Sequence, residues 1–371
     1  MSATCDACLR RGYLIGLLAG RIAGALGRPD SPAGILALGD AELATAVAGD
    51  GEREALRFLG RFEPRRARAD LRAAEVTAIC RHHEGFPALL GDLEDAPAAL
   101  FCRGRIELLA AADEQPAVTV VGARDASPYG LDRASELGRG IAVAGLTLVS
   151  GMALGIDGAA HRGALAGDGD TIAVLAGGPD YVYPRRHRQL HHEIVERGLV
   201  VSELPPGQRP YRWSFPARNR IMAALGRLTV VVEAGEASGT LITADFAHQL
   251  GRTVGAVPGR VTTPVAAGAN RLLRDGAAVV RDASDVLDEV FGAGTAEGRL
   301  PAAPPRPRLD PVERRLLDAV DSGCDLAGCA RHAGVETDTA RLTLARLELR
   351  GLVRRDGLAG WAVVGPMLPR R

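Results

Sequence analysis

The chain has 371 residues, of which 47% are hydrophobic, so it can bury a large core and we expect about two to three domains. Its 45 basic and 45 acidic residues give a formal net charge of zero. This excludes a strong overall field and requires any nucleic-acid-binding surface to be local. The sequence contains no lysine, so any anion site must use arginine forks or backbone N–H groups.

The sequence shows neither a long apolar run nor the charged-then-apolar order of a signal peptide. We therefore expect a cytoplasmic protein that does not enter a membrane. Six cysteines in a chain of this length do not make a disulfide scaffold, so reduced thiols are expected.

Residues 1–80 are rich in Ala, Leu, Arg and Glu at helical spacing and predict a small helical domain. A C-x-x-C pair, Cys5 and Cys8, stands at its start, and Cys80 with His82 supplies a second pair. Tetrahedral zinc takes four such ligands from two short segments. The halves lie about 70 residues apart, longer than in compact zinc modules, which favours ordinary reduced thiols and leaves a structural zinc as the alternative.

Residues 81–292 alternate short β-branched runs with segments of helical period, the pattern of βαβ units on a parallel sheet. Glycines and polar residues follow the predicted strands repeatedly. Helix N-termini and their free N–H groups converge at the carboxyl edge of such a sheet, so a binding crevice is expected there. The alternative is that these glycines only allow tight loops. The predicted strands are VTVVG, LTLVSG, TIAVLAGG, GLVVSEL, RLTVVVEAG and TVGAVPG.

Three turns in this region resemble phosphate cradles: GARDASPYG (122–130), SGMALGIDGAAH (150–161) and GEASGTLITADFAH (235–248). Each leads from a predicted strand into a predicted helix, with backbone donors aimed outward. None is a full G-x-G-x-x-G fingerprint, and a chain without lysine has no Walker lysine. Dinucleotide and ATP binding are therefore disfavoured.

The segment PPGQRPYRWSFPARNR (205–220) must cross the mouth of this crevice. Its arginines suit phosphate oxygens, and Trp213 and Phe215 offer flat faces on which unpaired bases stack. Cations alternating with aromatics fit a single strand, whose charge repeats along the backbone. The alternative is local: Phe215 as a hydrophobic staple and Asn219 as a cap.

In order, the motifs GAR, SGMALGIDGAAH, VYP, VSELPPG, FPARNR, SGTLITA, VPG and GANRLLRDGA resemble the DNA-processing protein A family, also called DprA or Smf. The resemblance covers about residues 86–290. It implies an extended Rossmann-like domain that binds single-stranded DNA without strong sequence preference, forms homodimers and, in transformable bacteria, loads the RecA recombinase. The family has no established catalytic activity, so a non-enzymatic protein without a cofactor is implied.

Carried onto this chain, the resemblance implies a strand-binding pocket built from the three turns and the crossing segment. Met152 departs from the family pattern, in which a glycine is usual, and would crowd a phosphate. Asp157 and His161 are expected to order the turn and helix rather than touch DNA, because a carboxylate repels phosphate. The predicted DNA-binding residues are Gly122, Arg124, Ser150, Gly151, Gly155, Ile156, Asp157, Arg212, Phe215, Arg218, Asn219, Arg220, Ser238, Gly239 and Thr240.

A nucleotide phosphoribohydrolase on the same kind of sheet is the competing interpretation. Such enzymes use P-G-G-x-G-T-x-x-E, whose glutamate acts on the ribosyl bond. Alignment on Gly239 and Thr240 puts Thr243 where that glutamate would stand. Glu203 and Glu233 remain as carboxylates at strand ends, and they keep this alternative open.

Residues 293–311 predict a proline-rich linker, and residues 312–371 predict three helices and a hairpin. That order is typical of a winged helix, similar to the C-terminal module of many family members. The third helix exposes Arg341 and Arg346, as a recognition helix would, although winged helices also dock proteins, and a partner or regulatory role is preferred. Four leucines are expected to turn partly inward: Leu342, Leu344, Leu347 and Leu349. The predicted fold is α/β, an extended Rossmann-like parallel sheet core between an N-terminal helical domain and this winged-helix domain.

Overall fold

The computed structural model forms two compact units, Met1–Pro301 and Ala302–Arg371. The boundary falls inside the predicted linker 293–311, of which residues 296–298 and 301–308 lie outside the described part of the chain. The structure describes residues 4–25, 33–47, 49–295, 299–300, 309–350, 352–356 and 360–363.

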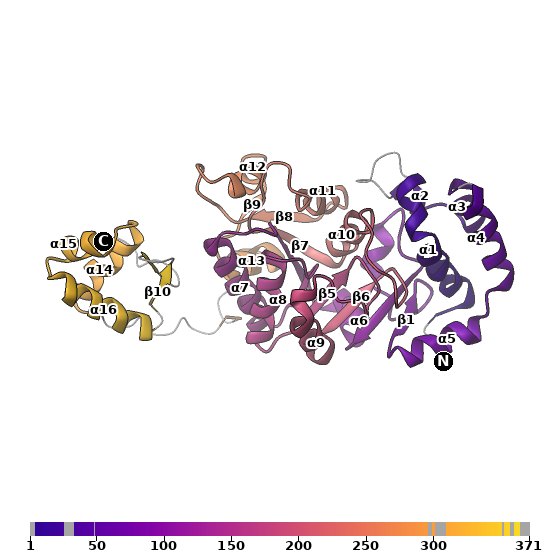
Figure 1. Ribbon diagram of the computed structural model, residues 1–371, viewed down its shortest axis with the longest axis horizontal. Helices are drawn as coiled ribbons and strands as arrows, with labels where there is room; N and C mark the ends of the chain where they lie inside the picture. Colours follow the sequence, from indigo (N-terminus) through magenta and orange to yellow (C-terminus); the bar gives the residue numbers. More distant parts are fainter. Residues whose placement is uncertain are drawn as a thin grey trace. The chain divides into compact units, whose positions relative to one another are not determined.

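A nine-stranded sheet forms the centre of the larger unit, with the order β1-β2-β6-β5-β4-β3-β7-β8-β9 (Figure 1). The strands from β6 to β9 in this order are parallel, and β2 is antiparallel to both β1 and β6. The six predicted strands are present; β1, β2 and β9 were not predicted. The strands are β1 Thr77–Cys80, β2 Ala99–Gly104, β3 Ala117–Val121, β4 Thr147–Ser150, β5 Thr171–Leu175, β6 Leu199–Ser202, β7 Gly226–Val231, β8 Thr253–Ala256 and β9 Ala278–Val279.

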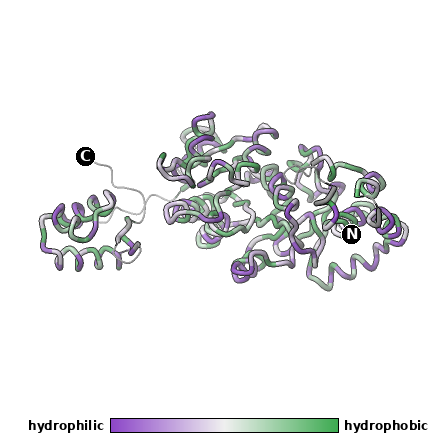
Figure 2. Tube along the Cα trace, turned by 45° about the horizontal axis from the view of Figure 1, so that its top comes forward, coloured by the Kyte–Doolittle hydropathy of each residue, from purple (hydrophilic) through white to green (hydrophobic). Residues whose placement is uncertain are grey.

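Helices cover both faces of this sheet, as expected for a Rossmann-like fold (Figure 1). On one face α7, α8 and α13 enclose an apolar core; on the other, α6, α10, α11 and α12 enclose a second. Hydrophobic and hydrophilic residues alternate along the helices (Figure 2). The helices are α6 Glu107–Glu114, α7 Pro128–Val143, α8 Ile156–Ala166, α9 Arg188–Arg197, α10 Ser214–Leu225, α11 Leu241–Gln249, α12 Ala267–Arg274 and α13 Ala283–Phe291.

The order in which the parallel strands are added to the sheet reverses at β3. From β3 the chain proceeds through β4, β5 and β6 on one side, and β7 then returns to pair with the other side of β3. Loops from the two halves separate above this point and leave a crevice at the carboxyl ends of the strands. The fold therefore positions the loops after β3, β4 and β7 around one opening.

The N-terminal residues are helical, as predicted, and they belong to the same compact unit as the sheet. The long helix α1 packs its apolar side against the shorter helices, and its other contacts reach β2 and the segment before α10. The predicted domain division at residue 80 stays a prediction. The helices are α1 Asp6–Ala25, α2 Ala33–Leu36, α3 Asp40–Ala46, α4 Gly49–Arg61 and α5 Pro64–Ala73.

The C-terminal unit has three helices followed by a two-stranded antiparallel sheet, and the winged-helix assignment stays a prediction. Two of the four leucines expected to turn inward do not: Leu342 is 66% exposed and Leu349 89% exposed. Leu344 and Leu347 are fully buried because they continue the stripe that Ala340 begins, three to four residues apart. The elements are α14 Pro311–Asp321, α15 Leu326–Ala333, α16 Thr337–Leu349, β10 Val353–Asp356 and β11 Gly360–Val363.

None of the helices in the described ranges has both the length and the apolar character needed to cross a membrane.

Candidate nucleic-acid interface

A cavity of about 490 Å³ opens at the carboxyl ends of β3 and β7, beside the start of α10. Its volume lies in the range of about 300–1,000 Å³ that ligand pockets occupy. We call this cavity the mouth. Nine of the fifteen predicted residues line it: Gly122, Arg124, Asp157, Phe215, Arg218, Asn219, Ser238, Gly239 and Thr240.

An exposed cation and two aromatic rings stand together at the mouth. The Arg124 guanidinium lies over the Phe215 ring, 5.1 Å from its centroid. The Tyr183 ring tilts against the same ring, with 5.8 Å between centroids. Arg124 and Tyr183 are exposed and Phe215 is half-buried, so the cluster presents both positive charge and flat apolar faces to solvent.

Tyr183, with Tyr181, was missing from the predicted set. Both line a smaller pocket that adjoins the mouth and shares Arg124, Phe215 and Arg218 with it. The sequence could have indicated both tyrosines, because they follow the predicted strand TIAVLAGG, whose carboxyl end lies at the same edge of the sheet.

Two amides of the loop after β4, those of Gly151 and Ala153, are not free to bind a ligand. The Asp157 carboxylate accepts hydrogen bonds from the N–H groups of Gly151 and Ala153, both at 3.2 Å. Burial raises the pKa of Asp157, and Arg218 opposes that shift. Because the carboxylate fills the place a phosphate would take, this loop is closed on itself. The expectation that Asp157 orders the turn agrees with these contacts.

Three neighbours of Asp157 also have structural roles, and their side chains are not part of the proposed DNA-binding surface. Ser150 is fully buried and donates its hydroxyl proton to the Val120 carbonyl at 2.6 Å. Ile156, the first residue of α8, is fully buried in the core that α7 and α8 cover. Gly155 has φ +77°, and a Cβ there would stand 2.2 Å from a loop carbonyl, so only glycine fits this approach.

Met152 is fully buried, and its side chain joins the apolar cluster around α9. It therefore packs inward, as its apolar character predicted. His161 is fully buried too: its Nδ1 lies 2.7 Å from the Thr171 hydroxyl, which itself donates to the Leu148 carbonyl. Nδ1 is therefore the protonated donor, and burial lowers the pKa of His161 to about 3.

Arg218 lines the mouth although its side chain is buried. The guanidinium donates to the carbonyls of Gly151 and Val174, the latter at 2.8 Å, and Nη2 lies 3.9 Å from the Asp157 carboxylate. Burial lowers its pKa to about 10, so it stays charged at neutral pH. Arg218 contributes positive potential to the mouth, but most of its donors are already used.

The prediction that Arg220 binds DNA is wrong. Its guanidinium is fully buried, with Nε 2.7 Å from Asp95 Oδ2 and Nη2 2.9 Å from Glu203 Oε1. Burial works to lower its pKa, but the two carboxylates outweigh burial and raise it. Arg220 holds the core together beneath α10 and cannot reach a ligand at the surface.

The loop before α11 faces the mouth from the β7 side. Ser238 and Thr240 are half-buried and Gly239 is exposed. The Thr240 hydroxyl donates to the Gly122 carbonyl at 2.9 Å, and the Asn219 amide donates to the Gly239 carbonyl at 3.4 Å. These bonds tie the loop after β3, helix α10 and the start of α11 into one rim.

Arg212 is exposed but lies outside the residues that line the mouth. Its neighbour Trp213 is buried and donates its indole N–H to the Ala19 carbonyl of α1 at 2.7 Å. The expected stacking face of Trp213 is therefore unavailable. The N-terminal helix instead anchors the segment that carries Arg212.

The two carboxylates that kept a hydrolase open both have structural partners. Glu203 pairs with Arg220 in the core. Glu233 is buried and accepts hydrogen bonds from the N–H and hydroxyl of Ser127 at the start of α7. Thr243, which stands where the hydrolase glutamate would be, is buried. The metal-ligating group that the described ranges assemble, Cys5, Cys8, Cys80 and His82, lies away from the mouth.

The cationic and aromatic rim lies at the switch point of a Rossmann-like sheet, which is where proteins of this fold class bind their ligands. The family model for DNA recombination-mediator protein A matches residues 77–291. The chain belongs to this family.

Named relatives agree with this assignment. A putative DNA processing protein DprA of Mycobacterium tuberculosis is 44% identical over 247 residues, which are 65% of this chain and 63% of that relative, so the match spans less than two thirds of its length. Protein Smf of Synechocystis is 38% identical over 302 residues, 73% of this chain and 76% of that protein.

Two solved structures are similar to this fold. The X-ray structure of DNA processing protein A from Streptococcus pneumoniae aligns with a TM-score of 0.59 at 30% identity and covers 74% of this chain and 97% of that one. DNA processing protein A from Helicobacter pylori, described for its single-stranded DNA binding mode, aligns with a TM-score of 0.52 at 29% identity over 58% of this chain and 94% of that one.

Proposed function

We propose that the chain binds single-stranded DNA at the mouth, without strong sequence preference. One observation carries the proposal: the exposed Arg124 guanidinium lies over the Phe215 ring, with Tyr183 against the same ring. Stacked bases and a phosphate need those two kinds of group side by side. The Helicobacter pylori protein, which is described as binding single-stranded DNA, is similar enough in fold to support the same ligand here.

Charge beside the mouth favours a polymer over a single nucleotide. Two segments that follow β5 and β6, the first of them running up to the start of α9, carry exposed arginines. The Gly178 N–H ties these segments together by donating to the Gln208 carbonyl at 2.8 Å. Within the described residues none of these arginines pairs with a carboxylate. A strand leaving the mouth over them meets further cations, so affinity falls as salt rises. They are Arg185, Arg186, Arg188, Arg209 and Arg212.

The rim explains the weak sequence preference. Arginine contacts to phosphate carry no sequence information, and every base offers a face for stacking on Phe215 or Tyr183. A duplex hides those faces, so the mouth prefers single strands. Arg124 and Phe215 at the mouth and the exposed Arg212 outside it are the principal contacts, with Asn219 and residues 238–240 shaping the facing wall.

The proposed protein is not an enzyme and uses no cofactor. A phosphoribohydrolase needs a free carboxylate at the mouth, whereas Glu203 and Glu233 are held by Arg220 and Ser127. Those pairings favour binding without turnover.

Downstream roles follow from family membership and are part of the proposal. The protein acts in the cytoplasm as a homodimer that hands single-stranded DNA to the RecA recombinase during recombination or DNA uptake. The C-terminal unit serves a partner or regulatory role rather than base readout. In support, Arg341 on α16 pairs with Asp338 at 2.9 Å, which reduces the positive field of that helix.

A gel-shift comparison of equal-length single-stranded and duplex DNA tests the proposal. We expect single strands to shift at lower protein concentration, with a dependence on strand length and on salt. Equal binding of duplex, or release of free base or ribose phosphate from nucleoside monophosphates, would favour other functions.

A further inference from the structure

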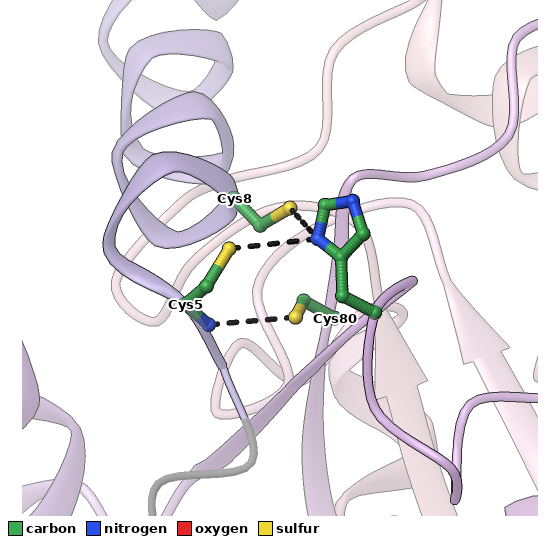
Figure 3. Close-up of side chains that lie close together, drawn as sticks. Cys5, Cys8 and Cys80 are labelled. Atoms are coloured by element: carbon green, nitrogen blue, oxygen red, sulfur yellow. Dashed lines mark hydrogen bonds between the residues drawn. The ribbon is translucent and has the colours of Figure 1, made fainter.

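Four metal-ligating side chains from the two ends of a long chain segment meet beside the sheet. Cys5 directly precedes α1, Cys8 lies in its first turn, and Cys80 ends β1 (Figure 3). His82 lies in the turn that follows β1. Their ligand atoms all lie within 4.8 Å of one another. In sequence the two pairs looked too far apart for a zinc module; the packing of α1 against the edge of the sheet removes that distance.

The spacing of the four atoms fits a tetrahedron around one ion. With metal–sulfur bonds of about 2.3 Å and a metal–nitrogen bond of about 2.0–2.1 Å, a sulfur and a nitrogen ligand stand about 3.6 Å apart. His82 Nδ1 lies 3.6 Å from Cys5 Sγ and 3.4 Å from Cys8 Sγ. Cys80 Sγ approaches the same group and accepts the Cys5 N–H at 3.4 Å, the type of contact that orients a metal ligand.

We propose that Cys5, Cys8, Cys80 and His82 bind one structural zinc ion. Three thiolates and an imidazole are the soft ligand set that zinc prefers, and no carboxylate belongs to the group. Four protein ligands fill a tetrahedron and leave no open position for a substrate, so the ion is structural. Ligand atoms this close suit a single ion better than an iron–sulfur cluster, whose own atoms would stand between the ligands.

The backbone holds both halves of the site in place. Cys5 precedes α1, and its carbonyl accepts the Leu9 N–H at 3.0 Å, so Cys5 and Cys8 lie one turn apart on the side facing β1. The Cys80 carbonyl accepts the His83 N–H at 2.9 Å, which closes the turn that projects His82. Cys8 and Cys80 are buried while Cys5 and His82 are exposed, so one side of the site is open for the ion to enter.

The ion would fasten α1 to β1 across more than seventy residues of chain, since Cys8 and His82 are 74 positions apart. Such a link stabilises the fold by closing a long loop, and α1 also supports the segment 205–213. Gly16 of α1 lies directly beneath Pro205, and Ala19 accepts the Trp213 indole N–H. An effect of zinc on Arg212 and DNA binding rests on the proposed function; the zinc site itself does not.

Metal content of the full-length protein, purified without a histidine tag or chelator, tests the site directly. We expect inductively coupled plasma mass spectrometry to find close to one zinc ion per chain, since the four residues form one tetrahedral site. Replacement of zinc by Co²⁺ should give the intense visible bands of tetrahedral cobalt together with thiolate-to-cobalt charge transfer in the near ultraviolet.

Variants with matched controls assign the ligands. Cys5→Ser and His82→Ala change exposed side chains and should lose the zinc and the cobalt spectrum while circular dichroism shows a folded protein. His83→Asn and Cys324→Ser should retain both, because His83 accepts the Gly85 N–H instead and Cys324 belongs to the C-terminal unit.

Three results would overturn the proposal: wild-type protein without zinc that takes up no cobalt, a disulfide joining two of the three cysteines in freshly purified protein, or full zinc content in Cys5→Ser and His82→Ala. Should a variant unfold, release of zinc from the wild type on thiol modification, followed with a colorimetric indicator, still decides the outcome. DNA affinity does not enter this test, so it can succeed or fail independently of the proposed function.

Discussion

Replacing Arg220 with methionine removes a guanidinium from the core while keeping most of the side-chain length. Arg220 is 0% exposed and bonds to Asp95, Glu203 and the Ala217 carbonyl. Without it, two buried carboxylates lose their counter-charge. Breaking a buried pair in this way costs about 3–5 kcal/mol, because the remaining charge is left unpaired in a poorly solvated place. We expect Arg220→Met to lower the free energy of unfolding by that amount.

Urea unfolding, followed by the fluorescence of buried Trp213 in protein that also carries Trp361→Phe, measures this loss of stability in the larger unit.

The pH dependence of the stability loss in Arg220→Met is a second test of the buried ion pair. Burial already raises the pKa of Glu203, against the effect of Arg220. Removing Arg220 raises the pKa of Glu203 in the folded state further above its value in the unfolded state. Protonation of Glu203 therefore stabilises the folded form at low pH, and this stabilisation is lost as the pH rises. The loss should therefore be larger at pH 8 than at pH 5.

Arg212→Ala is the matched control, because Arg212 is exposed and should leave stability within about 0.5 kcal/mol of wild type. Folded Arg220→Met should bind single-stranded DNA as wild type does, whereas Arg212→Ala should bind more weakly. A loss for Arg220→Met below about 1 kcal/mol, the typical value of an exposed pair, would refute the role of Arg220 as a buried pairing residue.

Three further predictions follow from single contacts. Burial lowers the pKa of His161 to about 3, so protons favour the unfolded state: between pH 7 and pH 5 stability should fall by about 2 kcal/mol from this residue, and His161→Gln should flatten that part of a urea-derived stability curve; an unchanged slope would contradict the assignment. Gly138→Ala would place a Cβ 2.2 Å from the Ala160 carbonyl of α8 and should cost about 1–3 kcal/mol by overpacking, seen as a lower melting temperature; full stability would show that α7 and α8 are not packed this closely. Tyr183→Ala should weaken binding of a single strand in a filter-binding titration while leaving the melting temperature unchanged, and Tyr129→Ala, an exposed tyrosine outside the mouth, is its control.

The sequence was sufficient to predict six of the nine strands, β3 to β8, and the edge at which the site lies. β-branched runs that end in glycine identify parallel strands and their carboxyl ends, and those ends must share an edge. Gly122, Arg124 and residues 238–240 could therefore be placed together although more than a hundred positions separate them.

The direction of individual side chains could not be predicted in the same way. Arg218 and Arg220 stand two positions apart on α10, which turns them about 200° from each other around the helix. The Arg218 side chain therefore reaches the strand ends at Gly151 and Val174, and the Arg220 side chain reaches Asp95. Only the tertiary structure reveals that both sides of α10 are covered.

Two other features depend on long-range packing for the same reason. Asp157 occupies the amides of its own loop, and no sequence pattern distinguishes a carboxylate that caps a turn from one that faces a ligand. Cys5 and Cys80 come together because α1 lies against β1, and the length of the intervening chain concealed that proximity.

Fluorescence anisotropy of a labelled oligo-dT strand, titrated with wild type, Arg124→Ala and Phe215→Ala, tests the mouth most directly. Phe215→Ala should weaken binding about 5- to 150-fold, the equivalent of ~1–3 kcal/mol for one stacked base. Arg124→Ala should weaken binding and also reduce the dependence of affinity on salt. Both variants should melt at the wild-type temperature. Folded variants that bind the strand with wild-type affinity would contradict the assignment of the mouth as the DNA-binding site.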